Sequence, residues 1–600
     1  MHFAFVRLVL PALLLTLPLT GCKRAKHLAA QATGSVGVTQ PTYTDAIQQA
    51  ISSGHMDALK WPDYSDLQPA VNSFYDDREF TLAWSKDGKP TSQASALMQA
   101  FSNARQRGLD PEDYDASRWQ GRVAALSTDD GKVAFDTAMT VNAARFLNAI
   151  HMGRTDPKYF AFGIDSSSKQ LDLPNVLGDQ IASADDVDKA LTDLEPQSAQ
   201  YKALREQLPH YLDLAAQDHT SPLPDPGTKS VALTHGYADL PALQQKLQLF
   251  GDLQGDTGTG TTPQPENTAA STSAPQTDTA APQADAAAPP ASTDLATLTD
   301  ALKHFQHRHG LTEDGKLSHD TVAALNIPMS TRVNEIDDAM ERWRWLPDPY
   351  QKPAILVNLP EFVLRTFDGD TQQFNMRVVV GQSKEDEHHT PMIAQQMKYL
   401  VFRPFWNIPP SIAKKEIVPH MAANAGYLES HNYETVNGKG EAQPASVAAV
   451  EHSTVMVREK PGPRNSLGLV KFMFPNPFNV YLHDTNAHYL FQRTRRDYSH
   501  GCVRVQDPPK LAEWLLRDNS KWDADTIQQT MNDDTVINKT VSLGGKSVPV
   551  LLFYGTAYFD NGEMHFFKDL YNYDDDLEKE LQHGYPFQHK PARTRAEASV

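Results

Sequence analysis

The spacing of apolar side chains changes once along this chain, near Ala354, and the change separates a helical part from a β-rich part. Before it, stretches such as "ASALMQAFSNARQRG" and "LPALQQKLQLFG" carry apolar residues at helical intervals and end at glycine. After it, "AILVNLPEFVLRTF", "FNMRVVVG" and "SVPVLLFYG" are β-branched or aromatic runs bounded by turn-forming residues. We therefore predict a multi-domain α+β protein.

Composition excludes several classes of function. A length of 600 residues predicts several domains, since a domain usually holds about 100–200 residues. The formal charge of −19 argues against a nucleic-acid partner, which requires a basic face. No CxxC pair is present, and His388-His389 has no companion ligands at zinc-like spacing. We expect no metal, and we expect these two histidines to lie in a solvated loop.

The first residues predict export. Arg7 is followed by an apolar stretch at 8–19, which is too short to span a bilayer and is typical of a signal peptide. The ending "LTGC" resembles a bacterial lipobox, which implies a signal peptide at 1–21 and a lipid on Cys22 that anchors the chain to a membrane. We expect a periplasmic protein, with Lys23 favouring the inner face of the outer membrane; the alternative is an ordinary secretory signal with a chance cysteine.

The helical part divides into four predicted segments. Residues 22–42 are small and polar and read as a tether, and 43–228 are predicted to form a helical scaffold domain. Residues 229–330 hold "FQHRHGLTEDGKL", which resembles a three-helix peptidoglycan-binding repeat. That repeat is interrupted at 252–293 by a stretch rich in Ala, Pro, Thr and Ser, which we predict to be disordered. The interruption leaves open whether the module binds glycan or is structural.

The remainder is predicted to hold the chemistry. A connector helix is expected at 331–353, a β-rich domain at 354–570 and a C-terminal tail at 571–600. Within the β-rich domain, 410–451 is helix-like and then loop-like, and we predict that it forms a cap inserted over the site.

Cys502, in "DYSHGCVRVQD", is the chain's second cysteine. With Cys22 assigned to lipid it has no disulfide partner, and a lone thiol in an oxidising compartment more often has a chemical task than a packing one. A thiol attacks as the thiolate, so it needs a base or a positive neighbour. His500 and His483 are both candidates, and spacing alone cannot choose between them.

The motifs "HDT" and "SHGCVRV" together resemble the signature of the L,D-transpeptidase (YkuD-type) catalytic domain. The stretches "MERWRWLP", "FWNIPPSIAKKEIVP" and "PGPRNSLGLVKFMFPN" are similar to its large, multi-domain (YcbB-type) branch. The resemblance covers most of residues 43–570. Asn486 departs from the branch, which often has proline there, but it is adjacent to the chemistry rather than part of it.

The resemblance implies roles for the residues of the motif. Cys502 would be the nucleophile, and His483 the general base that forms a thiolate–imidazolium pair with it. Asp484 would orient His483 through its backbone carbonyl. The amides of Gly501 and Cys502 would form part of the oxyanion hole, to which the hydroxyl of Tyr481 would add.

Further side chains are predicted to support the site. Ser499 and His500 would shape it by hydrogen bonding. Arg504 would favour the thiolate or hold a substrate carboxylate, with a structural ion pair as the alternative. Trp406 and Asn407 would line the donor cleft, although they are equally expected as core and turn.

The implied reaction is a two-step acyl transfer on peptidoglycan stem peptides, without a cofactor, that gives 3→3 cross-links and is blocked by carbapenems at Cys502. The acceptor stays open: a stem amine, water, a free D-amino acid or a lysine of a wall-anchored lipoprotein would all suit the same cysteine. A non-catalytic tether between membrane and wall is the rival from another class. We expect a monomer.

Overall fold

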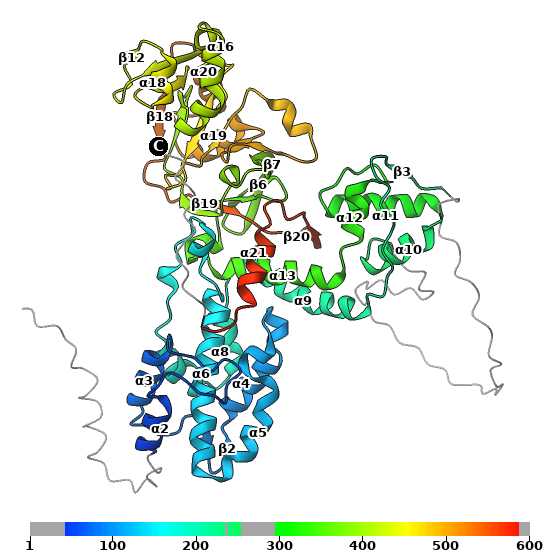
Figure 1. Cartoon of the computed structure of the whole chain (residues 1–600), viewed down its shortest axis with the longest axis vertical. Helices are drawn as coiled ribbons and strands as arrows, with labels where there is room; N and C mark the ends of the chain where they lie inside the picture. The colour runs from blue at the N-terminus through cyan, green and yellow to red at the C-terminus, as the bar shows by residue number, and fades with distance from the viewer. Residues whose placement is uncertain (1–42, 235–237, 254–293, 587–600) are drawn as a thin grey trace, which may run out of the picture.

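The computed structural model describes residues 43–234, 238–253 and 294–586. The predicted signal peptide, Cys22, the tether and most of the predicted disordered insertion lie outside these residues. In the part that is described, no helix is long and apolar enough to cross a membrane. Figure 1 shows a helical lobe at one end, a three-helix module to the side and a β-rich lobe carrying a small cap at the other end.

The helical scaffold is built around α6 (Asp129–Met152), which is buried along most of its length. Its N-cap Thr128 accepts a hydrogen bond from the Gly131 amide, and two aspartates in its first turn complement the helix dipole. Around it lie α2 (Thr44–Ile51), α3 (Gln68–Asp76), α4 (Ser92–Ser102), α5 (Trp119–Ala124), α7 (Leu173–Asn175), η7 (Val176–Ala182) and α8 (Val187–Leu194). Their shared core runs from Ile47 to Leu191.

Helix α9 (Ala199–Gln217) leaves this core. Its buried face, Tyr201, Leu204, Leu208 and Tyr211, joins the core of the β-rich lobe and packs on α13 (Met329–Arg344). The scaffold core therefore closes near Leu194, earlier than the boundary at 228 that was expected from helical periodicity. Periodicity shows which face of a helix is apolar but not which neighbour covers that face.

The three-helix module consists of α10 (Leu240–Leu249), α11 (Leu295–Arg308) and α12 (His319–Leu325), with β3 (Val231–Ala232) paired to β4 (Lys316–Leu317). It packs against the hairpin formed by β20 (Ala557–Asp560) and β21 (Glu563–Phe566). Arg308 fixes this contact, since it donates to Asp252 within the module and to the Met564 carbonyl, at 2.7 Å in each case.

The predicted connector is a buried central helix rather than a free link. Helix α13 joins the lobes through ion pairs: Arg105 of the scaffold contacts Asp337, and Arg342 contacts Asp574 of α21 (Tyr573–Leu581), both at 2.5 Å. The predicted tail is thus partly core, because Leu577 of α21 is fully buried. Figure 1 shows α21 crossing α13 between the lobes.

The β-rich lobe holds an eleven-stranded sheet in the order β18-β9-β14-β15-β17-β7-β6-β5-β19-β8, with β16 also pairing to β7. Its strands are β5 (Ile355–Asn358), β6 (Val363–Asp368), β7 (Thr371–Gly381), β8 (Ile393–Gln396), β9 (Tyr399–Phe402), β14 (Val470–Met473), β15 (Leu482–His483), β16 (Asp497–Ser499), β17 (Val503–Val505), β18 (Lys539–Ser542) and β19 (Pro549–Phe553). Helices α14 (Asp348–Gln351), α19 (Pro508–Leu516) and α20 (Ala524–Asn532) accompany it. The multi-domain α+β fold is confirmed.

The cap is larger than predicted and contains a sheet. Its strands β10 (Trp406–Asn407), β11 (Tyr433–Val436), β12 (Ala442–Gln443) and β13 (Met456–Glu459) pair in the order β10-β13-β11-β12. Its helices are α15 (Pro410–Ile412), η9 (Ala413–Ile417), α16 (Val418–Ala423), α17 (Tyr427–Ser430) and α18 (Val447–Glu451). A separate apolar core around Ile408, Ile417 and Val457 holds it together. Strands of two to four residues are too short to show a period of two in sequence.

Candidate active site

The pairing of β15 with β17 positions Cys502. The two strands are parallel, with His483 opposite Arg504, and the Val503 amide donates to the Tyr481 carbonyl at 3.1 Å. Cys502 therefore lies level with Tyr481. Because side chains alternate along a strand, Tyr481, His483, Cys502 and Arg504 project from the same face of the sheet. The fold brings the candidate nucleophile and the candidate base together on adjacent strands.

The ring of His483 is oriented by a backbone carbonyl. Its Nδ1 lies 2.5 Å from the Asp484 carbonyl oxygen, which can only accept a hydrogen bond. The proton therefore sits on Nδ1 and the lone pair on Nε2, as a general base requires. The Asp484 carboxylate is engaged elsewhere: it accepts from the Leu469 and Thr485 amides at 2.8 and 2.7 Å. The carbonyl contact matches the geometry that the motif implies; the roles themselves stay predictions.

Gly468 makes this arrangement possible. Its φ is +59°, and a Cβ at this position would lie 2.3 Å from the Asp484 carboxylate. No L side chain fits there without displacing the segment that orients His483.

We expect Gly468→Ala to lower both the apparent Tm and the turnover rate. The left-handed backbone alone costs about 1–2 kcal/mol, and the clash with Asp484 adds to it. Gly369→Ala is the matched control, since it has a φ of +60° but nothing within 4 Å of the added Cβ. Thermal unfolding and activity are measured on both variants. Equal losses in the two variants would contradict the proposed role of the clash.

The loop before Cys502 is closed by Ser499. Its hydroxyl donates to the Cys502 carbonyl at 2.5 Å and accepts from the Gly501 amide at 3.1 Å. Thr390 donates to the Gly501 carbonyl at 2.8 Å, a contact the sequence did not reveal. The Gly501 amide, which was expected in the oxyanion hole, thus already donates to Ser499. Gly501 has a φ of +118°, a backbone conformation that L side chains rarely adopt. The Cys502 amide and the Tyr481 hydroxyl remain as candidate oxyanion donors.

A buried lysine, missed in the sequence, flanks the site. Lys471 of β14 lies opposite His483 in the antiparallel register, so Lys471, His483 and Arg504 form one row across three strands. The Lys471 ammonium lies 5.4 Å from the centre of the Tyr481 ring. Lys471 and Arg504 both interact favourably with a Cys502 thiolate. The sequence signal that could have revealed Lys471 is the presence of one charged residue inside the apolar run "GLVKFMF".

The resting site favours a neutral pair. Burial raises the pKa of the Cys502 thiol to about 11, against the opposing effects of Tyr481, Lys471 and Arg504. Burial also lowers the pKa of the His483 imidazole to about 3, and the charges of Arg504 and Lys471 act in the same direction. Burial thus acts on both groups toward their neutral forms, because both charged forms lose hydration; the thiolate–imidazolium pair stays a prediction. Proton transfer to His483 would accompany attack.

We expect alkylation of Cys502 by iodoacetamide to keep rising above pH 9, where an ordinary thiol of pKa near 8.5 has levelled off. Lys471→Met removes a charge that favours the thiolate, so it should slow alkylation at pH 8 by about three- to tenfold. Lys539→Met, at an exposed site, is the control. The rate is followed by mass spectrometry of the Cys502 peptide. A plateau before pH 9, or equal rates in Lys471→Met and wild type, would contradict this account.

Comparison with known proteins agrees with this geometry. Residues 352–550 match the family model described as "L,D-transpeptidase catalytic domain". The matched range includes both Cys502 and His483. This part of the chain is similar to L,D-transpeptidase catalytic domains. Residues 69–208 match a "Scaffold domain" and 291–325 a "Putative peptidoglycan binding domain".

A curated relative supports the same assignment. The "Putative L,D-transpeptidase" of Haemophilus influenzae (strain ATCC 51907 / DSM 11121 / KW20 / Rd) is 33% identical over 275 residues, which are 44% of this chain and 54% of the relative. The chain thus spans about half the length of the curated relative that it matches.

His500, the other candidate base, contacts the cap rather than the thiol. Its Nε2 lies 2.8 Å from Glu416 Oε1 on η9, and its ring packs edge-on against His388. His388 and His389 are 8% and 6% exposed, so the expectation of a solvated loop was wrong. His389 stacks on Tyr571, with ring centres 4.2 Å apart, which explains its burial.

One group of potential metal ligands lies beside the transpeptidase site. Glu385, Glu387 and His388 present ligand atoms within 4.8 Å of one another. The Lys415 ammonium of the cap lies 2.5 Å from Glu385 and 3.4 Å from Glu387. This cation balances the charge of the carboxylates. We therefore interpret the group as part of an ion-pair contact between the cap and the β-rich lobe.

Trp406, Asn407 and Arg504 are the remaining residues that the sequence predicted at the site. Trp406 and Asn407 form β10, pair with Glu459 and Arg458, and belong to the cap sheet, where Trp406 packs on the cap core. Arg504 is half-buried beside His483, and burial lowers the pKa of its guanidinium.

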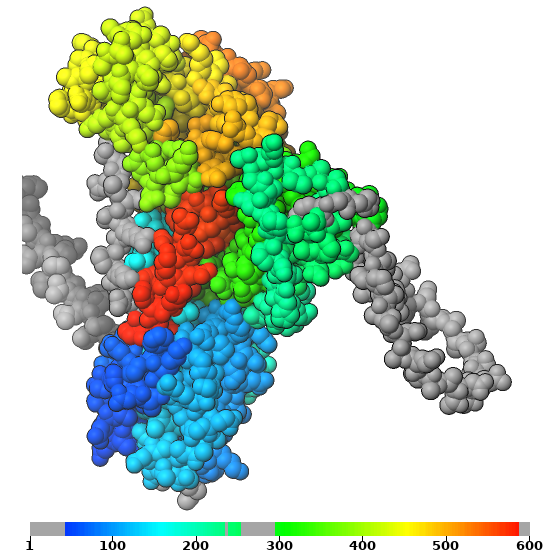
Figure 2. All heavy atoms as spheres, turned by 45° about the vertical axis from the view of Figure 1, so that its right-hand side comes forward, coloured from blue at the N-terminus to red at the C-terminus, as the bar shows by residue number. Residues whose placement is uncertain are grey.

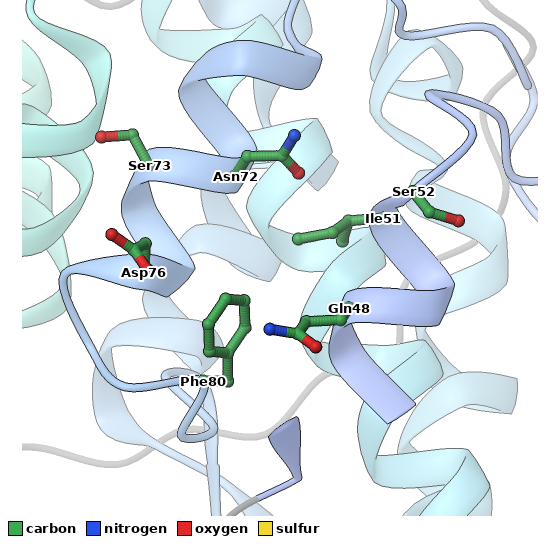
Figure 3. A pocket seen from close by; sticks show the side chains of 7 residues that line it. All are labelled: Gln48, Ile51, Ser52, Asn72, Ser73, Asp76 and Phe80. Carbon is green, nitrogen blue, oxygen red and sulfur yellow. The ribbon is translucent and has the colours of Figure 1, made fainter. Parts of the chain in front are cut away.

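A hollow in the scaffold lies in a different domain from Cys502. It holds about 510 Å³ between α2 and α3 and is lined by Gln48, Ile51, Ser52, Asn72, Ser73, Asp76 and Phe80. Figure 3 shows Gln48 and Phe80 facing each other across it. Its lining includes neither a cysteine nor a histidine, so the hollow is separate from the candidate site at Cys502.

Proposed function

We propose that this chain is a peptidoglycan L,D-transpeptidase that forms 3→3 cross-links through a thioester on Cys502. The observation that carries the proposal is the His483 ring, held by the Asp484 carbonyl so that Nε2 is free on the face that also carries Cys502. The catalytic-domain match and the peptidoglycan-binding match support peptidoglycan as the substrate.

In the first step, Cys502 Sγ attacks the carbonyl of the third residue of a tetrapeptide stem. The thiol proton passes to His483 Nε2, and the oxyanion is held by the Cys502 amide and the Tyr481 hydroxyl. The peptide bond to the terminal D-alanine breaks, and His483 returns the proton to the leaving amine. The products are free D-alanine and an acyl thioester on Cys502.

In the second step, a side-chain amine of another stem attacks the thioester. His483 takes a proton from the amine and returns it to the departing sulfur, so that the new amide and the free thiol are formed together. The thioester conserves the energy of the cleaved peptide bond, which suits a compartment without ATP. No cofactor enters either step.

We further propose export, lipidation at Cys22 and a position at the periplasmic face of the outer membrane. The support is the lipobox-like ending "LTGC" after a short apolar stretch, and the polar tether that follows. A lipid anchor of several acyl chains would hold the enzyme stably at the membrane.

Incubation of the purified protein with disaccharide tetrapeptides, followed by separation and mass analysis of the products, tests the proposal. Dimers joined 3→3, with one D-alanine released for each, are expected. Only tripeptides would indicate a carboxypeptidase, and an exchanged fourth residue an exchange enzyme. If Cys502→Ala restored every wall phenotype in a deletion strain, a non-catalytic tether would replace the proposal.

A further inference from the structure

Two tyrosines in the segment between β15 and β17 are unusually exposed. Among the described residues, five large apolar or aromatic side chains are exposed by more than a third, and only two of them, Tyr489 at 67% and Tyr498 at 40%, are aromatic. Both belong to the segment between His483 and Cys502. Both rings are therefore accessible to a ligand that lies on this segment.

One end of this segment reaches the reactive centre. Tyr489 lies on η10 (His488–Gln492) and interacts electrostatically with Arg504. Arg504 is the neighbour of His483 in the sheet. The exposed ring of Tyr489 therefore borders the site where the thiol and imidazole meet.

The middle of the segment is basic and ordered. The Arg493 guanidinium lies 5.1 Å from the centre of the Tyr498 ring, and its Nη1 donates to the Tyr498 hydroxyl at 3.1 Å. Arg495 donates to Asp497 at 2.6 and 2.8 Å, and also to Ser383. Three arginines in the four residues 493–496 stand out in a chain whose net charge is −19.

The other end touches the three-helix module. The hydroxyls of Thr312, in the loop after α11, and Thr494 lie 3.0 Å apart, and Asp320 of α12 interacts electrostatically with Arg495. In Figure 2 the module borders the orange part of the catalytic lobe. The segment is thus a continuous connection from the module to the reactive centre.

We propose that Tyr489, Arg493 and Tyr498 form a track on which a polymeric glycan strand of peptidoglycan, with its acidic stem peptides, lies between the module and Cys502. The apolar C–H faces of pyranose rings suit exposed aromatic rings, as apolar groups do on an aromatic face. Arginine suits the carboxylates of the stems, since its guanidinium binds them with charge-assisted hydrogen bonds. This inference rests on the proposed function and adds a second contact with the polymer, outside the module.

The test compares wild type with the triple variant Y489A/R493A/Y498A in the full chain. Co-sedimentation with purified sacculi measures binding to the polymer, and D-alanine release is measured on sacculi and on soluble disaccharide tetrapeptide. Ile537→Ala, which truncates another exposed side chain, is the control. Circular dichroism and the Tm check that each variant is folded.

We expect the triple variant to bind sacculi at least about tenfold more weakly and to lose activity on sacculi about tenfold more than on the soluble substrate, since two aromatic contacts and one charged contact are removed. Ile537→Ala should match wild type. Unchanged sedimentation, or equal losses on the two substrates, would overturn the track. A wild-type protein that releases D-alanine from neither substrate would instead remove the proposed function, and sedimentation would still judge the track.

Discussion

Replacing Cys502 by alanine is expected to lower the rate of D-alanine release at least about ten-thousandfold, to the limit of detection. Without the sulfur there is no atom that can hold the acyl group, and the tyrosine, lysine and arginine around it can only stabilise charge. Release of D-alanine from tetrapeptide substrate, followed with a coupled assay, gives the rate.

Cys502→Ser separates the chemistry of sulfur from the loss of a side chain. The hydroxyl has a far higher pKa than a thiol, and its surroundings already disfavour an anion, so this variant should be almost as inactive. Both variants should unfold at nearly the wild-type temperature, because the side chain is small and the sulfur makes only weak hydrogen bonds, with the Asn479 carbonyl at 3.6 Å and with Tyr481. More than a tenth of the wild-type rate in the alanine variant would exclude Cys502 as the nucleophile.

The second large effect is expected at His483. Substitution by glutamine removes the Nε2 lone pair that takes the thiol proton, and the rate should fall by about a hundred- to ten-thousandfold. The loss should appear in kcat, since the imidazole acts on the thiol rather than on substrate binding.

His500→Gln is the matched control, because it changes the other histidine of the motif. His500 is paired with Glu416 of the cap, so its loss should cost less than about tenfold and should act on KM as much as on kcat. If His500→Gln were the more damaging of the two, the base would have to be reassigned and the orientation of His483 by Asp484 would have no catalytic meaning.

Sequence patterns could predict the division into lobes, because the change of period is local, whereas the choice of His483 over His500 rested on the resemblance of "HDT" and "SHGCVRV" to a family signature and not on spacing. They could not predict the row Lys471–His483–Arg504, which depends on the register of three strands from distant parts of the chain. In that row, Lys471 and Arg504 lower the pKa of both Cys502 and His483, while burial raises the pKa of the thiol and lowers that of the imidazole.

The packing of helix α9 was hidden from the sequence for a related reason. Helix α9 has the same helical period as the scaffold helices, yet its apolar face is covered by α13, which begins more than a hundred residues later. The burial of His388 and His389 likewise comes from partners at His500 and Tyr571. A charged or polar sequence shows that a segment tolerates contact with water. It does not show that the folded protein leaves that segment exposed.

The central claim, that Cys502 accepts the acyl group, is tested most directly by intact-protein mass spectrometry after incubation with a carbapenem. Wild type is expected to gain the mass of one opened carbapenem, and peptide mapping should place it on Cys502, while Cys502→Ser gains none. An unmodified wild-type protein, or an equal adduct on the serine variant, would contradict the account.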